Sequence, residues 1–144
     1  MATFTKYESG IEQFFNKISD GFGATDTWKA AIHTDAPVVA TDTTISDLTQ
    51  ISGANGYTTG GTSISFTSSR SGGTITATAT DVVWTASGGN LGSSTTGRYF
   101  SVYDDTPTSP ADPLQMYYDY GSTFTVADTE TMTLDFGASF WTAA

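Results

Sequence analysis

His33 is the first residue to consider for catalysis, because it is the only histidine in the chain. An imidazole acts as a general base in acyl transfer when a serine nucleophile and an orienting carboxylate lie beside it. Serines are plentiful, but the G-x-S-x-G turn that exposes a nucleophilic serine in α/β-hydrolases is absent. We therefore expect His33 to be an ordinary surface or partly buried histidine, and we expect no catalytic residues.

Four aspartates form a second candidate site, because Asp104 and Asp105 are followed by Asp112 and Asp119. Their oxygens could gather around Ca²⁺, which takes roughly six to eight oxygen ligands. The spacing of an EF-hand loop is missing, and Asp-Asp-Thr-Pro is also a common loop sequence. Two of the carboxylates could serve as the acid pair of a glycosidase if the fold brought them together. We expect loop aspartates, with neither a metal nor another cofactor bound.

Composition and charge exclude several classes of protein. Fifteen acidic and five basic residues give a net charge of −10, whereas nucleic-acid-binding proteins carry clustered Lys or Arg. Cysteine is absent, so disulfides and thiolate sites are excluded. The chain has no run of about 20 apolar residues and no signal-peptide pattern at its start. We expect a protein made in the cytoplasm that binds neither nucleic acid nor membrane.

The elements that position these residues begin with a helix predicted from Tyr7 to Ser19. Apolar residues recur there every three or four positions, which gives the helix one apolar face. After Gly23 the pattern changes to alternation and short β-rich runs between turn residues. The stretch from Ile45 to Ile51 stays open between a helical turn and a strand, because its apolar residues recur every three positions.

Trp28 to Thr34 is predicted as the first strand, with alternating residues on opposite faces. Asn55-Gly56 predicts a tight turn with positive φ, and Gly72-Gly73 predicts a hairpin. The alternation breaks after Asp81, which predicts a bulge or a change of register. Further strands are predicted over Tyr57 to Ser69, Thr74 to Ala86, Arg98 to Tyr103, Leu114 to Tyr120, Ser122 to Val126 and Glu130 to Phe136.

These runs predict a mainly β protein: an antiparallel β-sandwich, jelly-roll-like, with one N-terminal amphipathic helix. Antiparallel pairing is expected because no later helix is available for parallel crossovers. An immunoglobulin-like sandwich shares the same alternation and turn spacing. The length fits a single domain over residues 1–144, with the helix at about 7–19 and strands from about 27 to 141.

Aromatic residues supply the candidate binding groups. Alternation places Tyr118 and Tyr120 on one face of a strand and Tyr117 on the other, so at least one ring can face outward. Exposed tyrosines stack on sugars or fill protein interfaces. For most of these rings, and for Phe140 and Trp141, core packing is the simpler expectation because a sandwich core needs bulky residues from both sheets.

Several short segments carry a family resemblance: Phe4 to Ser9, Asp26 to Ile32, Ile45 to Ile51 followed by Gly53 to Gly61, and Tyr118 to Ser122. In order and spacing, over nearly the whole chain, they resemble a family of small proteins encoded by tailed bacteriophages and prophages. Members are usually described as phage structural proteins. The nearest function is that of the small β-sandwich cement proteins that decorate icosahedral heads. The resemblance implies no catalytic residue.

The resemblance implies a non-enzymatic virion protein on the capsid surface. Such a protein binds the outer surface of the major capsid protein shell, stabilises it and associates with itself as a homotrimer. The residues expected at these interfaces are Phe4, Lys6, Tyr7, Tyr118, Tyr120, Phe140 and Trp141.

Two other functions stay open. One is a tail or fibre-associated module that binds host-surface glycan through outward tyrosines and Thr/Ser-rich loops. The other is a hydrolase of cell-wall or capsule sugar, which needs an acid pair such as Asp104 and Asp119. The three functions differ in virion location, in copy number and in turnover of envelope material.

Overall fold

The computed structural model describes residues 2–10, 25–93 and 95–143. Strands dominate these residues, and the pairings between strands are antiparallel. The predicted mainly β class is confirmed. The elements are β1 (Thr5–Lys6), β2 (Trp28–His33), the 3-10 helix η1 (Ile45–Asp47), β3 (Thr62–Ile64), β4 (Phe66–Ser71), β5 (Thr74–Ala79), β6 (Val82–Thr85), β7 (Gly97–Asp104), β8 (Leu114–Phe124), β9 (Thr131–Leu134) and β10 (Trp141–Ala143).

β2 and β7 lie inside a five-stranded sheet with the order β1-β8-β7-β2-β3. Their register places Ala31 opposite Ser101 and His33 opposite Tyr99. Side chains on both faces of β2 and β7 are buried, so other parts of the chain cover both faces of the sheet. As a result, Ala31 and His33 lie inside the protein, although they alternate with the residues of the main core.

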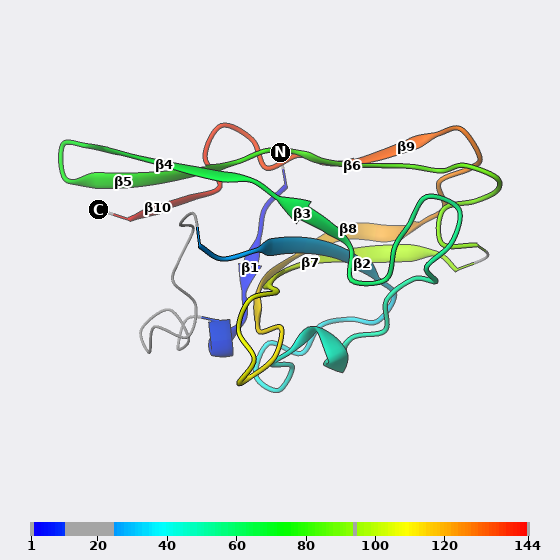
Figure 1. The fold of residues 1–144 in the computed structure, drawn as a ribbon, viewed down its shortest axis with the longest axis horizontal. Helices are drawn as coiled ribbons and strands as arrows, with labels where there is room; N and C mark the ends of the chain where they lie inside the picture. The colour runs from blue at the N-terminus through cyan, green and yellow to red at the C-terminus, as the bar shows by residue number, and fades with distance from the viewer. Residues whose placement is uncertain (1, 11–24, 94, 144) are drawn as a thin grey trace.

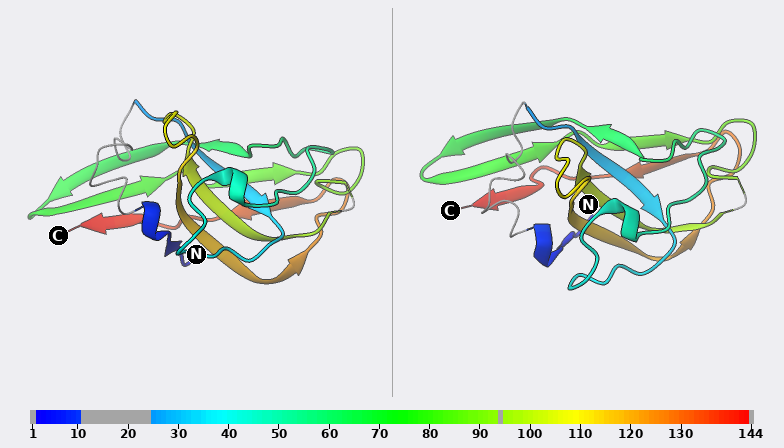
Figure 2. Two further views of the ribbon diagram at one scale, coloured as in Figure 1. Left: turned by 90° about the horizontal axis from the view of Figure 1, so that it is seen from below. Right: turned by 60° about the horizontal axis from the view of Figure 1, so that its bottom comes forward.

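The smaller sheets form a second layer over one face of the five-stranded sheet (Figure 1). One has the order β10-β5-β4, and the other pairs β6 with β9. The β4–β5 hairpin turns at Gly72 and Gly73, whose φ angles of 57° and 84° lie in the left-handed region that glycine tolerates. In Figure 2 this hairpin extends to one end of the molecule, beside β10.

Two hydrophobic clusters hold the layers together. The main one lies between the five-stranded sheet and the smaller sheets, where Trp28 and Phe100 meet Trp84 and Leu134. Burying one side chain of Leu or Phe size contributes about 1.5–3 kcal/mol, so such contacts stabilise the layered arrangement. The second cluster covers the opposite face of the five-stranded sheet and contains Tyr7, Ala31, Ile45, Leu48, Tyr103 and Leu114.

Several sequence predictions are confirmed by the element bounds. The predicted strands Trp28 to Thr34 and Arg98 to Tyr103 correspond to β2 and β7, and the break after Asp81 separates β5 from β6. Asn55 and Gly56 have φ angles of 51° and 96°, as a tight turn with positive φ requires. Local turn chemistry and alternation were sufficient for these features.

Other elements differ from the predictions. The strands predicted over Leu114 to Tyr120 and Ser122 to Val126 form a single strand, β8, which ends at Phe124. The register with β7 shifts after Asp119, where Gly121 has a φ of 92°, and pairing resumes at Phe124, so the strand is bent but not interrupted. The open segment from Ile45 begins as η1 and is extended again at Leu48. β1 and β10 were not predicted, because each is only a few residues long and is defined by its pairing with β8 or β5.

The predicted N-terminal helix from Tyr7 to Ser19 lies mostly outside the described residues. Residues 8–10 are helical. The Tyr7 N–H donates to the Gln115 carbonyl at 3.0 Å, which attaches the start of this segment to β8. The full helix and the jelly-roll topology stay predictions.

Candidate functional site

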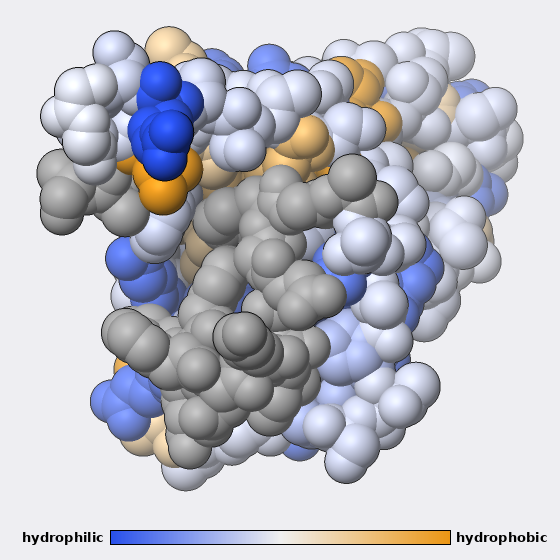
Figure 3. All heavy atoms as spheres, turned by 60° about the vertical axis from the view of Figure 1, so that its left-hand side comes forward, coloured by the Kyte–Doolittle hydropathy of each residue, from blue (hydrophilic) through white to orange (hydrophobic). Residues whose placement is uncertain are grey.

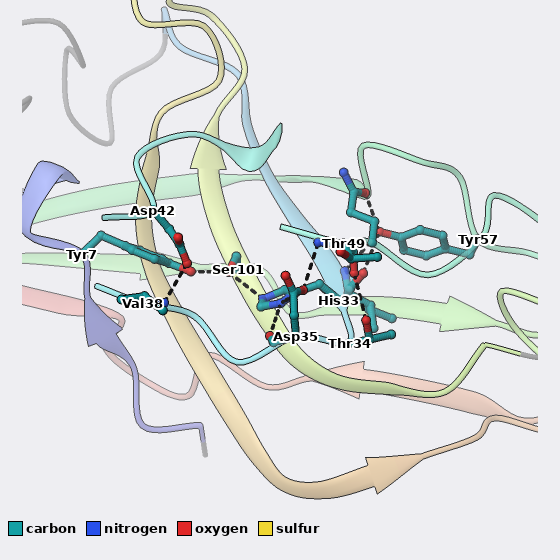
Figure 4. Close-up of polar contacts among 11 residues, drawn as sticks. Tyr7, His33, Thr34, Asp35, Val38, Asp42, Thr49, Tyr57 and Ser101 are labelled. Carbon is teal, nitrogen blue, oxygen red and sulfur yellow. Dashed lines mark hydrogen bonds and ion pairs between the residues drawn. The ribbon is translucent and has the colours of Figure 1, made fainter. Parts of the chain in front are cut away.

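A chain of hydrogen bonds joins the hydroxyls of Tyr7 and Ser101 to the imidazole of His33 (Figure 4). The Tyr7 hydroxyl lies 3.0 Å from Ser101 Oγ, and Ser101 Oγ lies 2.8 Å from His33 Nε2. The β2–β7 register produces the second contact, because Ser101 pairs with Ala31, two residues from His33. All three residues are 0% exposed. The fold thus brings a serine to the histidine, which the sequence did not predict.

Asp35 completes the chain at the other imidazole nitrogen. His33 Nδ1 lies 3.0 Å from the Asp35 backbone carbonyl and 3.5 Å from its Oδ1, while that same Oδ1 accepts a hydrogen bond from the Thr49 N–H at 2.9 Å. A carbonyl only accepts, so Nδ1 carries the proton in the neutral ring. Nε2 then accepts from Ser101, and Ser101 accepts from Tyr7. Every member of the chain is satisfied in this arrangement.

Burial sets the protonation states of this chain. Loss of hydration lowers the pKa of His33, against the opposing effect of its hydrogen bond to Asp35 and of the charges on Asp35 and Asp42. Burial raises the pKa of the Tyr7 hydroxyl, with Ser101 acting in the opposite direction. The imidazole and the phenol are therefore neutral near pH 7, and the chain is an uncharged network.

The serine–histidine distance matches that of a nucleophile and its base, but access and orientation do not. A substrate carbonyl must reach Ser101 Oγ, which is closed off from solvent. Ser101 Oγ already donates to His33 Nε2 and accepts from the Tyr7 hydroxyl, and the group that orients the imidazole by accepting from Nδ1 is a main-chain carbonyl. The arrangement fixes β2, β7 and the N-terminal segment to one another.

The aspartates singled out in the sequence are held by different partners. Asp105 binds Lys29 at 2.7 Å, Asp119 binds Arg98 at 2.9 Å, and the Thr106 N–H donates to buried Asp104 at 3.0 Å. Burial, followed by the charge of Asp105, raises the pKa of Asp112. Within the described residues, no group of three or more His, Asp or Glu side chains is placed to hold a metal ion.

The predicted interface residues Phe4, Lys6, Phe140 and Trp141 do lie together. With Ser139 they surround a hollow of about 220 Å³, and we call these five residues the terminal surface. β1 brings its residues there by pairing with β8, and β10 by pairing with β5. Figure 2 shows β1 and β10 on the same side of the molecule. Segments from opposite ends of the sequence thus build one surface.

Aromatic contacts and one cation organise the terminal surface. The Phe4 ring stacks on Phe136 at 5.3 Å and meets Phe140 edge-on at 5.4 Å. Lys6 Nζ lies 5.8 Å from the centre of the Trp141 ring, within the range of a cation–π contact. The surface therefore combines half-buried rings with an exposed positive charge, in a protein of net charge −10.

The other predicted interface residues lie elsewhere. Tyr118 adjoins the terminal surface through Phe4, at 6.0 Å between ring centres. Tyr120 is 47% exposed and packs on Phe124. Tyr7 is fully buried, so it cannot contact a partner in this conformation; its hydroxyl belongs to the Ser101 network.

Sequence reasoning missed Ser101, Asp35 and Phe136. For Ser101 the sequence does contain a signal, because it is the single serine within the aromatic and apolar run Tyr99 to Tyr103. A polar side chain in such a buried run needs a hydrogen-bond partner. Phe136 and Asp35 carry no comparable local signal. Their positions depend on which strands pack together.

Comparisons with known proteins add no relative to this description: no protein-family model, curated protein or solved structure matches the chain. In the part of the chain that is described, no helix has the length and apolar character to cross a membrane. Functional inference therefore depends on the residues and their geometry.

Proposed function

We propose that the protein is a non-enzymatic bacteriophage virion structural protein that decorates the outer surface of the capsid. It binds the major capsid protein through the terminal surface and stabilises the shell. The jelly-roll-like sandwich with an N-terminal helix belongs to this proposal, since the resemblance to phage proteins implies a small β-sandwich. The protein is made in the host cytoplasm and is then located on the capsid surface of the assembled virion.

One observation carries the proposal: the side chains of Phe4, Lys6, Phe140 and Trp141 line the same hollow. Aromatic rings that are partly exposed around a hollow are typical anchors of protein interfaces. The nearby cation allows the hollow to accept a carboxylate beside an apolar side chain. A partner residue of this kind fits a surface built from the two terminal segments.

The placement of the reactive groups supports a binding function over catalysis. The imidazole of His33 and the hydroxyl of Ser101 are sealed inside, and the candidate aspartates lie in separate ion pairs and turns. A decoration protein needs none of these groups at its surface. Many copies of modest affinity stabilise a shell because each copy clamps neighbouring subunits.

Binding to capsid shells that lack the protein tests the proposal. We expect density at regular positions on the outer head by cryo-EM. Trp141→Ala should weaken binding by about tenfold or more, because an interface anchor contributes about 2 kcal/mol. The matched control is Val83→Ala, which removes an exposed apolar side chain from β6, away from β10 (Figure 1). Absence from the head, or equal binding by both variants, would contradict the proposal.

The second candidate is a tail or fibre-associated module that binds host-surface glycan, and the exposure of Tyr120 favours it. An exposed ring stacks on the apolar face of a sugar. Glycan-array binding that is lost in Tyr120→Ala and kept in Trp141→Ala would support this function. Density confined to the tail would have the same meaning.

A further inference from the structure

Lys6 is the cation at the rim of the hollow, and its charge is not neutralised there. Lys29 and Arg98 lie in ion pairs with aspartates. Across residues 2–10, 25–93 and 95–143, no carboxylate is paired with Lys6, whose Nζ lies 5.8 Å from the centre of the Trp141 ring. An exposed lysine beside aromatic rings can bind a carboxylate from another molecule. In a protein with a net charge of −10, the hollow is therefore a place that attracts an acidic group.

The hollow has room for one apolar side chain. Its volume is about 220 Å³, and its walls include Phe4, Met116, Phe136 and Phe140. A cavity of roughly 150 Å³ holds a benzene molecule. The hollow therefore accepts a side chain of valine size or somewhat larger, and its partner must present a projecting apolar side chain with a carboxylate close to it.

The chain itself exposes few large apolar side chains that could enter such a hollow. In the described part of the protein they are Val38, Ile75, Val83 and Tyr120. Among the coloured atoms of Figure 3, hydrophobic surface likewise occurs in small separate patches. Ile75, Val83 and Tyr120 lie on β5, β6 and β8, where the flanking strand residues limit how far a side chain can project. Val38 is 53% exposed and instead begins a turn.

Val38 and Asp42 enclose this turn, which we call the 38–42 turn. The Thr41 and Asp42 N–H groups donate to the Val38 carbonyl at 3.0 and 2.9 Å. The Val38 N–H donates to Asp42 Oδ2 at 2.7 Å, which holds the carboxylate beside the valine (Figure 4). No cation from the described segments is paired with Asp42. Tyr120, by comparison, adjoins Asp119, whose charge is already in an ion pair.

We propose that the 38–42 turn of one copy docks on the hollow of a second copy, with Val38 inside and Asp42 paired with Lys6. Val38 is exposed in the single chain, so it does not fill its own hollow. On docking, its side chain leaves water and contacts aromatic rings, and two charges that lack a partner within the chain neutralise each other. The turn and the hollow are different surfaces, so the contact is heterologous and repeats until a ring closes. A ring of three copies is the homotrimer that the phage resemblance implies.

This self-association closes the surface that the proposed function assigns to the capsid shell. Both occupants need the same hollow, so a copy that holds the 38–42 turn of its neighbour cannot bind the major capsid protein there. The shell must displace the neighbouring copy before it binds. This competition rests on the proposed function, whereas the contact between copies does not.

The mass of the full-length protein in solution tests the self-association. By sedimentation equilibrium we expect an assembly of 15.1-kDa chains, with three chains in the homotrimer. Val38→Glu should weaken the association by about tenfold or more, because a charged side chain is costly to bury among aromatic rings. Val83→Glu is the matched control, since the same change at a valine that is 52% exposed on β6 should leave the assembly intact. Far-UV circular dichroism checks that each variant is folded.

Charge reversal tests the pairing of Asp42 with Lys6. Lys6→Glu and Asp42→Lys should each weaken the association, and both changes in one chain should restore it, because opposite charges again face each other across the contact. Asp42→Lys also removes the acceptor of the Val38 N–H. Rescue by the second change therefore distinguishes an ion pair between copies from a local effect on the turn.

A mixture of two defective variants tests the contact itself. Val38→Glu keeps an intact hollow, and Lys6→Glu keeps an intact 38–42 turn. Each variant alone should be monomeric, whereas an equimolar mixture should form a dimer that contains one intact contact. A monomeric wild type, an assembly that Val38→Glu leaves unchanged, the absence of charge rescue, or a mixture that stays monomeric overturns the inference.

Capsid shells that lack the protein separate this inference from the proposed function. Val38→Glu should bind them at a lower protein concentration than the wild type, because its hollow is free. Equal or weaker binding by Val38→Glu overturns the competition for the hollow. Shells that bind neither protein contradict the proposed function alone, since the self-association is measured without them.

Discussion

Two hydroxyl-to-hydroxyl hydrogen bonds in this protein have nearly the same chemistry and opposite surroundings. Tyr7 and Ser101 share one at 3.0 Å in the interior, whereas Thr67 and Thr78 share one at 2.6 Å on the exposed hairpin. An interior partner that loses its bond cannot turn to water, but an exposed one can. Access to water therefore decides which of the two contributes strongly to stability. The histidine–serine pair lies in the interior, whereas the exposed hairpin carries serine and threonine hydroxyls.

The largest expected effect comes from deleting the centre of the buried network. Ser101→Ala leaves the Tyr7 hydroxyl and His33 Nε2 without a partner, and each unsatisfied buried group costs about 1–3 kcal/mol. We expect the free energy of unfolding, measured with urea, to fall by about 2–5 kcal/mol. The matched exposed change, Ser68→Ala, should stay within about 0.5 kcal/mol. Equal losses in the two variants would remove the contrast between the regions.

Acidification should act on the same network. The pKa of His33 is lowered in the folded protein, so the unfolded chain binds a proton at higher pH than the folded one. Stability is thus fully present above the unfolded pKa of about 6.5 and declines as pH falls below it, by at most about 1.4 kcal/mol per pH unit for one proton.

Urea unfolding of the wild type and of His33→Phe between pH 8 and pH 5 measures this contribution. The variant is expected to be less stable overall, because Ser101 loses its acceptor. Its stability should nevertheless change less with pH than that of the wild type. Parallel pH profiles would show that His33 does not carry the effect.

A smaller loss is expected for Tyr7→Phe. The change removes the hydroxyl that donates to Ser101 and keeps the buried ring, so the cost should be about 1 kcal/mol. Tyr120→Phe is the control, since the same atom is removed from a ring that is 47% exposed, and it should be neutral. Thermal or urea unfolding of the two variants side by side gives the difference.

The smallest effect is expected on the hairpin. Thr78→Val deletes one partner of the short hydroxyl contact to Thr67, and water replaces it, so stability should change by less than about 0.5 kcal/mol. A loss as large as that of Ser101→Ala would show that the exposed hydroxyls are coupled to the fold as strongly as the buried ones.

Local patterns predicted much of the fold but little of the candidate site. Alternation defined β2 and β7, and glycine pairs defined the turn at Gly72-Gly73. Phe4, Lys6, Phe140 and Trp141 were expected at an interface, and the structure gathers them. Tyr7 was expected there too, but its burial depends on β8 and on the second hydrophobic cluster, which no local pattern encodes.

The sequence by itself determined the mainly β class, the acidic charge and the absence of cysteine chemistry, because these depend on composition and on short-range periodicity. Tertiary structure alone decided the fate of the reactive groups. Ser101 lies 68 residues from His33 and 94 residues from Tyr7, and they meet because strands pair at long range and a second layer of chain closes over them. Because the serine–histidine pair is buried, it forms an internal hydrogen bond that joins β2 to β7.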